Sequence, residues 1–295
     1  MRRGLKTAPY HRSNQLKRIA GIAWIILVCA VPASAQQRPL VTEDPETIGA
    51  GLVLLEGGLD RQPDVFYPAS GLKGTLLRLP TLGVSFGISS IAELQIDGGL
   101  YNRLNVTSRQ TAPLSSLLDF SGDSTHDVED ITVATKIRLL SETPGRPAFG
   151  VRFATRLPNA SNESGLGLDT TDFHASVLFG KTVQSIRFVG NVGLGILGDP
   201  VEGNRQNDVL TYGASVARAV RQGLEVVGEV NGRLDTRAGD PPVGTESRGA
   251  IRVGGRYTKS TVRLDAGLII GLTPSDPSLG FTVGATWVFK AFTIP

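Results

Sequence analysis

One alternating stretch between Val128 and Leu157 constrains the fold of this chain more than any other. Apolar side chains alternate with small or cationic ones along residues 131–139, a turn containing Pro144 and Gly145 follows, and the alternation resumes along residues 149–157. A period of two puts the two sets on opposite faces of an antiparallel pair. The apolar face then needs either a second sheet packed against it or contact with lipid, as in a barrel whose charged face lines water.

The same alternation recurs along the chain and predicts about twelve strands. We expect them over Gly49–Asp60, Thr75–Ile88, Ile91–Asn105, Val128–Leu140, Pro147–Leu157, Thr170–Lys181, Ser185–Leu197, Asp208–Ala219, Leu224–Asp235, Ser247–Tyr257, Thr261–Leu272 and Phe281–Phe292. Each is a little longer than the ~9–11 residues that a tilted membrane strand requires. Because Pro80 cannot donate to a strand ladder, the second strand is expected to have a bulge or a displaced start.

Connections of two lengths alternate between these strands. Short ones are expected at Ser89–Ser90, Glu142–Arg146, Thr182–Gln184, Val220–Gly223 and Thr258–Ser260. Longer ones, rich in Pro, Gly, Asp and Asn, are expected at Arg61–Gly74, Val106–Asp127, Pro158–Asp169, Gly198–Asn207, Thr236–Glu246 and Thr273–Gly280. Short periplasmic turns and longer extracellular loops are typical of outer-membrane barrels. An even strand count would put both chain ends on the periplasmic side.

The side chains on the two faces also favour a barrel over a sandwich. Most strands carry several charged or polar residues on one face, for example Glu93, Gln95, Asp97 and Arg103. A sandwich core could not bury so many charges, whereas a hydrated lumen tolerates them. Aromatic residues on the apolar faces fall near strand ends, as expected at lipid–water interfaces. The sequence therefore predicts an all-β, up-and-down antiparallel transmembrane β-barrel.

The N-terminal residues have the features of an export signal. Six basic residues and no acid precede or flank an apolar run at Ile19–Val31, and Ala33-Ser34-Ala35 resembles a cleavage site. We expect a signal peptide over residues 1–35, by the general or the twin-arginine route, an irregular periplasmic segment over 36–48 and the barrel over 49–295. Without the leader the chain has 24 basic and 27 acidic residues, a net charge of −3, which removes support for nucleic-acid binding.

The sequence offers little sign of catalysis. The only cysteine lies in the leader, and the two histidines beyond it, His126 and His174, have no paired-ligand spacing, so neither metal nor cofactor is expected. His174 and Ser176 share one strand face, a spacing similar to the local motif of outer-membrane phospholipases. That family's pair faces lipid, whereas this pair should face the lumen. An acyl-ester hydrolase is therefore the alternative, and a non-enzymatic barrel is the prediction.

Basic residues on the inward faces are the main candidates for a functional role. The candidate lumen or selectivity residues are Lys136, Arg138, Arg152, Arg156, Arg248, Arg252, Arg256 and Arg263, with the acids Glu225 and Glu229. A tight turn is expected to bring Arg263 roughly opposite Arg256, and like charges in such positions suggest a field that steers anions. The alternative is a salt-bridge network within the lumen, using nearby acids such as Asp97 and Asp265.

Short motifs resemble those of a family of bacterial outer-membrane transporters named for the MetA pathway of phenol degradation. They are Leu40-Val41-Thr42-Glu43-Asp44-Pro45, Leu54-Leu55-Glu56-Gly57-Gly58, Asp127-Val128, residues 134–140 and Leu157-Pro158. The resemblance implies an outer-membrane channel for small organic compounds. We expect passive passage of small solutes, anionic or aromatic, in a protein surrounded by outer-membrane lipid and placed there by the barrel-insertion machinery. A closed structural barrel is a further alternative.

Overall fold

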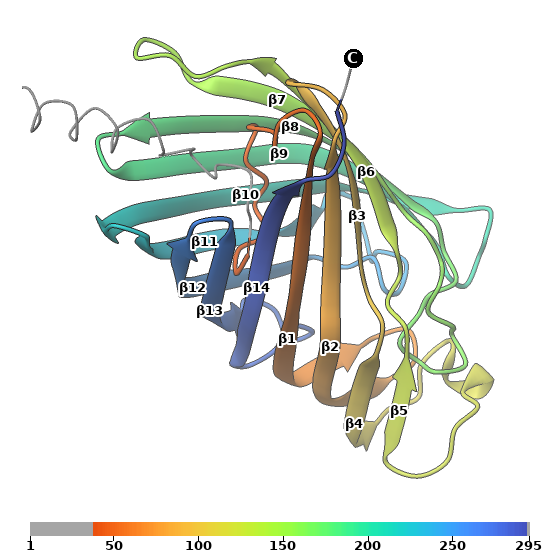
Figure 1. The fold of residues 1–295 in the computed structure, drawn as a ribbon. Helices are drawn as coiled ribbons and strands as arrows, with labels where there is room; N and C mark the ends of the chain where they lie inside the picture. Colours follow the sequence, from red (N-terminus) through yellow and green to blue (C-terminus); the bar gives the residue numbers. More distant parts are fainter. Residues whose placement is uncertain (1–37, 294–295) are drawn as a thin grey trace, which may run out of the picture. The chain divides into compact units, whose positions relative to one another are not determined.

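The computed structural model describes residues 38–293, and the predicted signal peptide lies outside this range. Its strands belong to one antiparallel sheet (Figure 1). They are β1 (Leu52–Tyr67), β2 (Leu72–Gly87), β3 (Ala92–Gly99), β4 (Asn102–Arg109), β5 (Ser124–Asp127), β6 (Thr132–Leu140), β7 (Ala148–Arg156), β8 (Asp172–Val183), β9 (Ile186–Gly198), β10 (Gln206–Arg221), β11 (Leu224–Asp235), β12 (Arg248–Lys259), β13 (Val262–Gly271) and β14 (Gly280–Lys290).

Pairing of the last strand with the first closes the sheet into a barrel. β14 pairs with β1 from Leu52 opposite Lys290 to Arg61 opposite Phe281. β3 and β4 both pair with β2, and the next strand along the barrel is likewise divided, with β6 on β3 and β5 on β4. Each divided pair therefore acts as one strand, and the barrel has twelve. This confirms the fold predicted from the alternation.

The strand boundaries follow the prediction closely except near β1 and in the expected loop Val106–Asp127, where β4 continues to Arg109 and β5 occupies Ser124–Asp127. β11 has the predicted bounds, and most other strand ends differ by one or two residues. β1, however, continues to Tyr67, so its connection to β2 is residues 68–71 and the long loop expected at Arg61–Gly74 is wrong. The stretch contains Pro63, which lacks an N–H, and Asp64, which has a φ of 60°. A register shift between Gln62 and Val65 accommodates both within the strand.

The irregularity expected at Pro80 changes which side chains face inward. Leu79 N donates to Tyr101 O at 2.8 Å, and residues 100–101 interrupt the ladder between β3 and β4. Glu93 and Gln95 face inward before this break, whereas Asn102 and Leu104 are the buried residues after it. Arg103, paired with Leu77, is consequently exposed on the outside, and its expected inward position is wrong.

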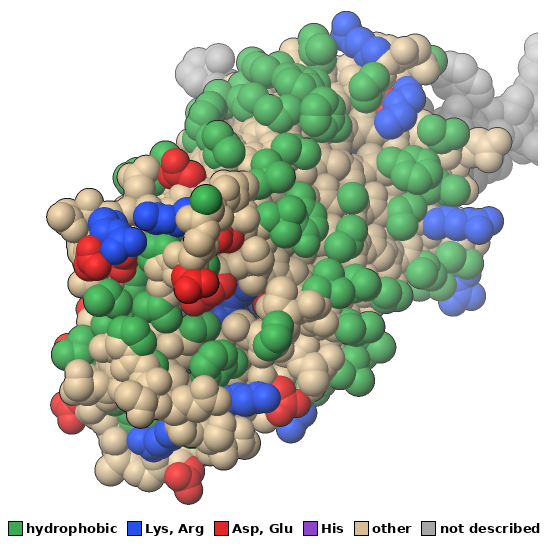
Figure 2. Space-filling view, turned by 180° about the vertical axis from the view of Figure 1, so that it is seen from behind, with side chains coloured by type: hydrophobic (Ala, Val, Ile, Leu, Met, Phe, Trp, Pro, Cys, Tyr) green, Lys and Arg blue, Asp and Glu red, His purple; other side chains and the backbone are tan. Residues whose placement is uncertain are grey.

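Apolar side chains cover the outside of the barrel, and charged ones fill the inside. Phe153, Leu194 and Val253 are 54%, 61% and 49% exposed, whereas Lys136 and Glu93 are 0% and 1% exposed. Figure 2 shows hydrophobic side chains over much of the visible face, with charged ones along its edges and within its lower-left part. Such an outer surface fits hydrocarbon, as outer-membrane barrels require. No helix within residues 38–293 is long and apolar enough to cross a membrane.

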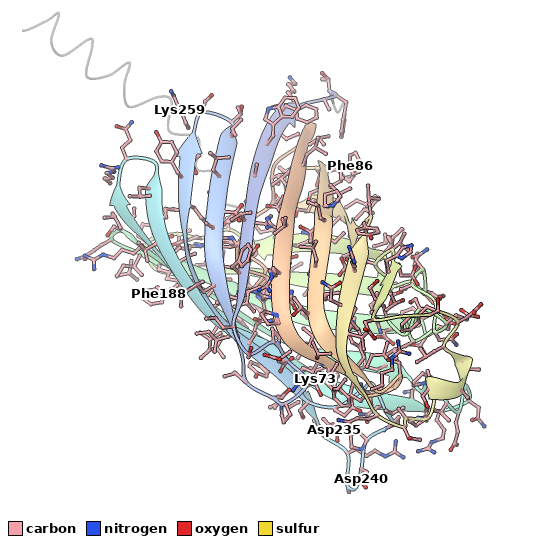
Figure 3. All side chains as sticks on the ribbon, turned by 90° about the horizontal axis from the view of Figure 1, so that it is seen from below. Lys73, Phe86, Phe188, Asp235, Asp240 and Lys259 are labelled. Carbon is pink, nitrogen blue, oxygen red and sulfur yellow. The ribbon has the colours of Figure 1, made fainter. Side chains whose placement is uncertain are left out.

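The two ends of the barrel differ as expected. The short turns lie at one end, near Lys259 and Phe86, and the longer loops lie at the other, near Lys73, Asp235 and Asp240 (Figure 3). The outward aromatic side chains Phe179, Phe188 and Trp287 are 43%, 48% and 48% exposed near the short-turn end. At the loop end, a small apolar core of Val65, Leu72, Leu76 and Leu104 packs beneath the loops, beside the 3-10 helix η1 (Ser115–Leu117).

Candidate functional site

The segment that precedes β1 lies inside the barrel. Residues 38–48 have no helix or strand, and their partners come from strands around the lumen (Figure 1). The sequence predicts an irregular periplasmic segment over 36–48. Its described part, residues 38–48, is irregular and lies within the lumen, and we call it the inner segment.

Backbone groups of the inner segment are held by polar side chains of the barrel wall. Glu229 accepts hydrogen bonds from Val41 N at 2.9 Å and Thr42 N at 2.9 Å, and it also accepts one from Arg252 at 3.0 Å. Asn191 accepts from Glu43 N and donates to Glu43 O, both at 2.7 Å. Because an irregular segment cannot satisfy its own N–H groups, these contacts replace the ladder that a strand would use.

The acidic side chains of the inner segment pair with cations of the wall. Glu43 lies 3.3 Å from Lys136 Nζ and 3.1 Å from Arg152 Nε. Asp44 pairs with Arg187 at 2.6 Å, and Glu46 pairs with Arg138. The three acids of the segment therefore pair with four basic residues of the wall.

Arg38 anchors the other end of the inner segment. Its guanidinium donates to Thr81 at 2.9 Å and to Thr282 at 2.8 Å. It also lies 3.8 Å from Asp60 and 3.6 Å from Asp265. These partners come from β1, β2, β13 and β14, the strands at which the barrel closes.

Glycines of the wall make room for the inner segment. A Cβ at Gly180 would lie 2.9 Å from Pro45, and one at Gly267 would lie 3.2 Å from Pro39. A Cβ at Gly284 would overlap the guanidinium of Arg38. Part of the high glycine content, 36 of 295 residues, thus serves close approach of the segment to the strands.

The basic candidates predicted from sequence each have an acidic neighbour within 4.0 Å. Lys136 pairs with Glu93 at 2.9 Å, and Arg156 with Asp130 at 2.6 Å. The pairs at the other strands are Arg252 with Glu229 at 3.0 Å, Arg248 with Asp276 at 3.8 Å, Arg256 with Glu225 at 3.9 Å and Arg263 with Glu225 at 4.0 Å. The geometry is that of a salt-bridge network, in which the inner segment supplies part of the acids.

One expected juxtaposition differs in register. Arg256 lies opposite Asp265, and Arg263 lies opposite Thr258, so the two arginines are offset by two residues. Lys136 and Arg152 are directly opposite, and Glu93 and Glu43 balance their charges. Like charges across a ladder are tolerated here because acids intervene.

Two cavities remain inside the barrel beside the inner segment. The first, the segment-side cavity, has about 430 Å³ and is lined by residues 38–41 and Glu43 together with wall residues that include Asp97 and His174. The second, the loop-end cavity, has about 370 Å³ and extends to the loop residues Ala160 and Leu166. Because both are lined by Arg78, Glu129, Asp130 and Thr132, they are adjacent.

His174 and Ser176, the pair whose spacing is similar to the phospholipase motif, face this interior. Arg152 lies opposite Ser176 and Ala154 opposite His174, so both side chains of the pair are on the lumen side of β8. Among the described residues no hydrogen bond joins His174 to Ser176, as activation of the hydroxyl would require. Within residues 38–293, no group of three or more His, Cys, Asp or Glu side chains could hold a metal ion.

The acids of the inner segment are lumen residues that the candidates predicted from sequence did not include. Glu43, Asp44 and Glu46 stand in a stretch without alternation, so no periodicity assigned them to a face. A signal was nevertheless present, because the basic inward faces needed counter-charges and this acidic stretch lay unassigned.

Comparisons with known proteins agree with this architecture. A family model with the description "Putative MetA-pathway of phenol degradation" matches residues 51–288. No curated protein matches the chain. An outer membrane channel from Pseudomonas putida F1 has a TM-score of 0.56 and 15% identity, over 83% of this chain and 98% of that one. This likeness shows a shared barrel fold.

Two further solved barrels are less similar. The NanC porin has a TM-score of 0.48 and 10% identity, over 80% of this chain and 98% of its own. The translocator domain of the autotransporter NalP from Neisseria meningitidis has a TM-score of 0.46 and 11% identity, over 94% and 98%.

Proposed function

This chain belongs to the family described as "Putative MetA-pathway of phenol degradation", and on that premise we propose that it is an outer-membrane channel for passive diffusion of small solutes. The observation that carries the proposal is the pair of adjacent cavities inside a closed barrel, about 430 and 370 Å³, with charged side chains on their walls. Hydrated interior space of this size suits single small molecules rather than polymers.

The inner segment would set the rate of passage. It crosses the lumen between the two adjacent cavities and the short-turn end, where Glu46 and Thr47 bind Arg138 and Ser90. A solute that enters from the loops therefore has to pass this segment or displace it. We propose that the segment is the constriction of the channel.

Small organic anions and aromatic compounds are the proposed solutes. Arginines on the lumen wall provide attraction for anions, and tightly balanced salt bridges near the inner segment limit the flux of bulk ions. Neither His174 nor Ser176 is assigned a chemical step, because passage requires no bond to break.

Planar bilayer recordings test the proposal directly. Full-length refolded protein should give discrete conductance steps, and Arg252→Gln with Arg256→Gln should shift the reversal potential in a KCl gradient toward cation preference. Arg237→Gln, at an exposed loop position, is the matched control and should leave the reversal potential unchanged.

Two results would contradict a channel. Absence of conductance in the wild type and also after removal of the inner segment would indicate a closed structural barrel. Hydrolysis of acyl esters that Ser176→Ala abolishes would instead indicate an enzyme.

A further inference from the structure

The lining of the loop-end cavity has more arginines than acids. Four arginines and two acids line this cavity, namely Arg78, Arg156, Arg233, Arg248, Glu129 and Asp130. Both acids already have partners, since Glu129 pairs with Arg78 and Asp130 pairs with Arg156. Among the lining residues the excess positive charge therefore resides on Arg233 and Arg248, which we call the arginine pair. Asp276, the acid beside Arg248, does not line the cavity.

Backbone carbonyls fix the position of the arginine pair. Arg233 donates to Glu246 O at 2.9 Å and to Gly244 O at 2.7 Å, and no carboxylate of the described chain lies within 4.0 Å of it. Arg248 donates to Ser275 O at 2.9 Å and Phe66 O at 3.0 Å, with Asp276 only at 3.8 Å. Carbonyl oxygens orient a guanidinium but leave its full charge in place, so the pair is prepared for an anion.

The two arginines are cross-strand neighbours on the barrel wall. Arg233 lies directly opposite Arg248 in the ladder between β11 and β12. Like charges in this position are unfavourable unless a counter-charge intervenes. Beside Lys136 and Arg152 two acids, Glu43 and Glu93, supply it. Beside the arginine pair the one acid within 4.0 Å, among the described residues, is Asp276, at 3.8 Å from Arg248.

Apolar side chains also line the loop-end cavity. Val65 and Leu76 belong to the small buried core, and Tyr67 and Leu166 pack against that core while also lining the cavity. A pocket of 300–1,000 Å³ with an apolar wall and a few fixed polar groups is typical of small-molecule sites. The volume here, about 370 Å³, lies in that range.

We propose that the loop-end cavity is a binding site for a small organic anion with an apolar body, such as a monocyclic aromatic carboxylate. Its carboxylate would accept hydrogen bonds from the arginine pair, and its ring would lie against Leu76 and Tyr67. The inference rests on the proposed channel function and gives it a substrate class.

The charges that line the segment-side cavity disfavour further movement of an anion from this site into the barrel. The segment-side cavity is lined by the acids Glu43, Glu56, Asp60, Asp97, Glu129 and Asp130 and by the cations Arg38, Arg78, Arg152 and Arg252, with His174. Acids are in excess there, whereas cations are in excess around the arginine pair. An anion is consequently held at the loop end before it reaches the inner segment.

Calorimetric titration of the full-length protein in detergent micelles tests the site, with benzoate as the probe. Benzoate should bind, while benzamide, which lacks the charge, and acetate, which lacks the ring, should bind about tenfold more weakly or less. Arg233→Gln and Arg248→Gln should each weaken benzoate binding about tenfold, and Arg237→Gln should not change it.

Each variant is checked for the heat-dependent gel shift of a folded barrel. Arg233→Lys, which keeps the charge but loses the planar fork, should give an intermediate affinity. Equal binding of benzoate and benzamide, or unchanged affinity in both glutamine variants, would overturn the site.

This experiment separates the site from the channel. Benzoate binding without any bilayer conductance would contradict the proposed function and leave the site intact. Conductance without benzoate binding would contradict the site and leave the channel intact.

Discussion

Lys136 shows how much a single residue of the lumen depends on its partners. Its side chain is 0% exposed and lies between Glu93 and Glu43, one from the wall and one from the inner segment. A buried cation with two carboxylates is stable only as a complete group, because the loss of one member leaves an uncompensated charge away from water.

We therefore expect Lys136→Ala to destabilise the barrel by about 3–5 kcal/mol. Urea unfolding in micelles, followed through the fluorescence of Trp287, measures the change. Lys136→Met combined with Glu43→Gln and Glu93→Gln removes the whole charged group and should recover most of the loss. A triple variant as unstable as the single one would show that shape, rather than charge balance, matters at this site.

Gly284 offers a second test at the residue scale. Because a side chain there overlaps the guanidinium of Arg38, Gly284→Val should push the inner segment away from β14 and raise the single-channel conductance. Gly255→Val is the matched control, since its Cβ would meet nothing nearer than Glu225 O at 3.5 Å. Equal conductance in the two variants would show that the segment does not depend on this contact.

At the scale of elements, the inner segment has two separable roles, one steric and one electrostatic. It occupies space in the lumen, and its acids neutralise Lys136, Arg138, Arg152 and Arg187. Removal of residues 38–47 should therefore increase conductance and, because these four cations lose partners, shift the reversal potential toward anions.

A variant with Glu43→Gln, Asp44→Asn and Glu46→Gln separates the two roles. It keeps the chain in place but removes the charges, so the shift toward anions should appear with a smaller gain in conductance. Bilayer recordings in a KCl gradient measure both quantities. Increased cation preference after the deletion would contradict the assigned electrostatic role.

The sequence predicted the strands better than it predicted their faces. Alternation identified twelve strands, because lipid outside and water inside impose a period of two. It could not show that the break at Leu100 and Tyr101 changes the inward set, so Arg103 was placed on the wrong face. The partners of Arg138 and Arg152 were also hidden, since Glu46 and Glu43 reach them from a segment without any period.

At the scale of the whole molecule, the barrel has apolar side chains outside and charged side chains inside, the reverse of the usual arrangement in a globular protein. Val253, with 49% exposure, faces outward in the middle of β12, while Glu229 and Arg252 form a pair inside. Val253→Arg should cost about 2–4 kcal/mol, because it puts a charge into hydrocarbon. Unfolding of the protein in lipid vesicles by urea measures this cost.

Ser215→Arg is the matched substitution on the inner face. Ser215, on β10, lies opposite Glu229 of β11. The added cation therefore meets a hydrated, acidic wall, and Ser215→Arg should lower the free energy of unfolding much less than Val253→Arg does. Comparable losses in the two variants would contradict the assignment of the outer face to lipid.

The fit between wall glycines and the inner segment has a genetic consequence. A single base change at a glycine codon can add a side chain. At Gly180, Gly267 or Gly284 that side chain would press against Pro45, Pro39 or Arg38 of the inner segment, and at Gly180 also against the guanidinium of Arg187. Selection for cells that admit a bulky antibiotic should therefore enrich alleles at these three codons more than alleles at outward glycines such as Gly190. Small residues at these wall positions would then be what keeps the passage narrow enough to exclude large solutes.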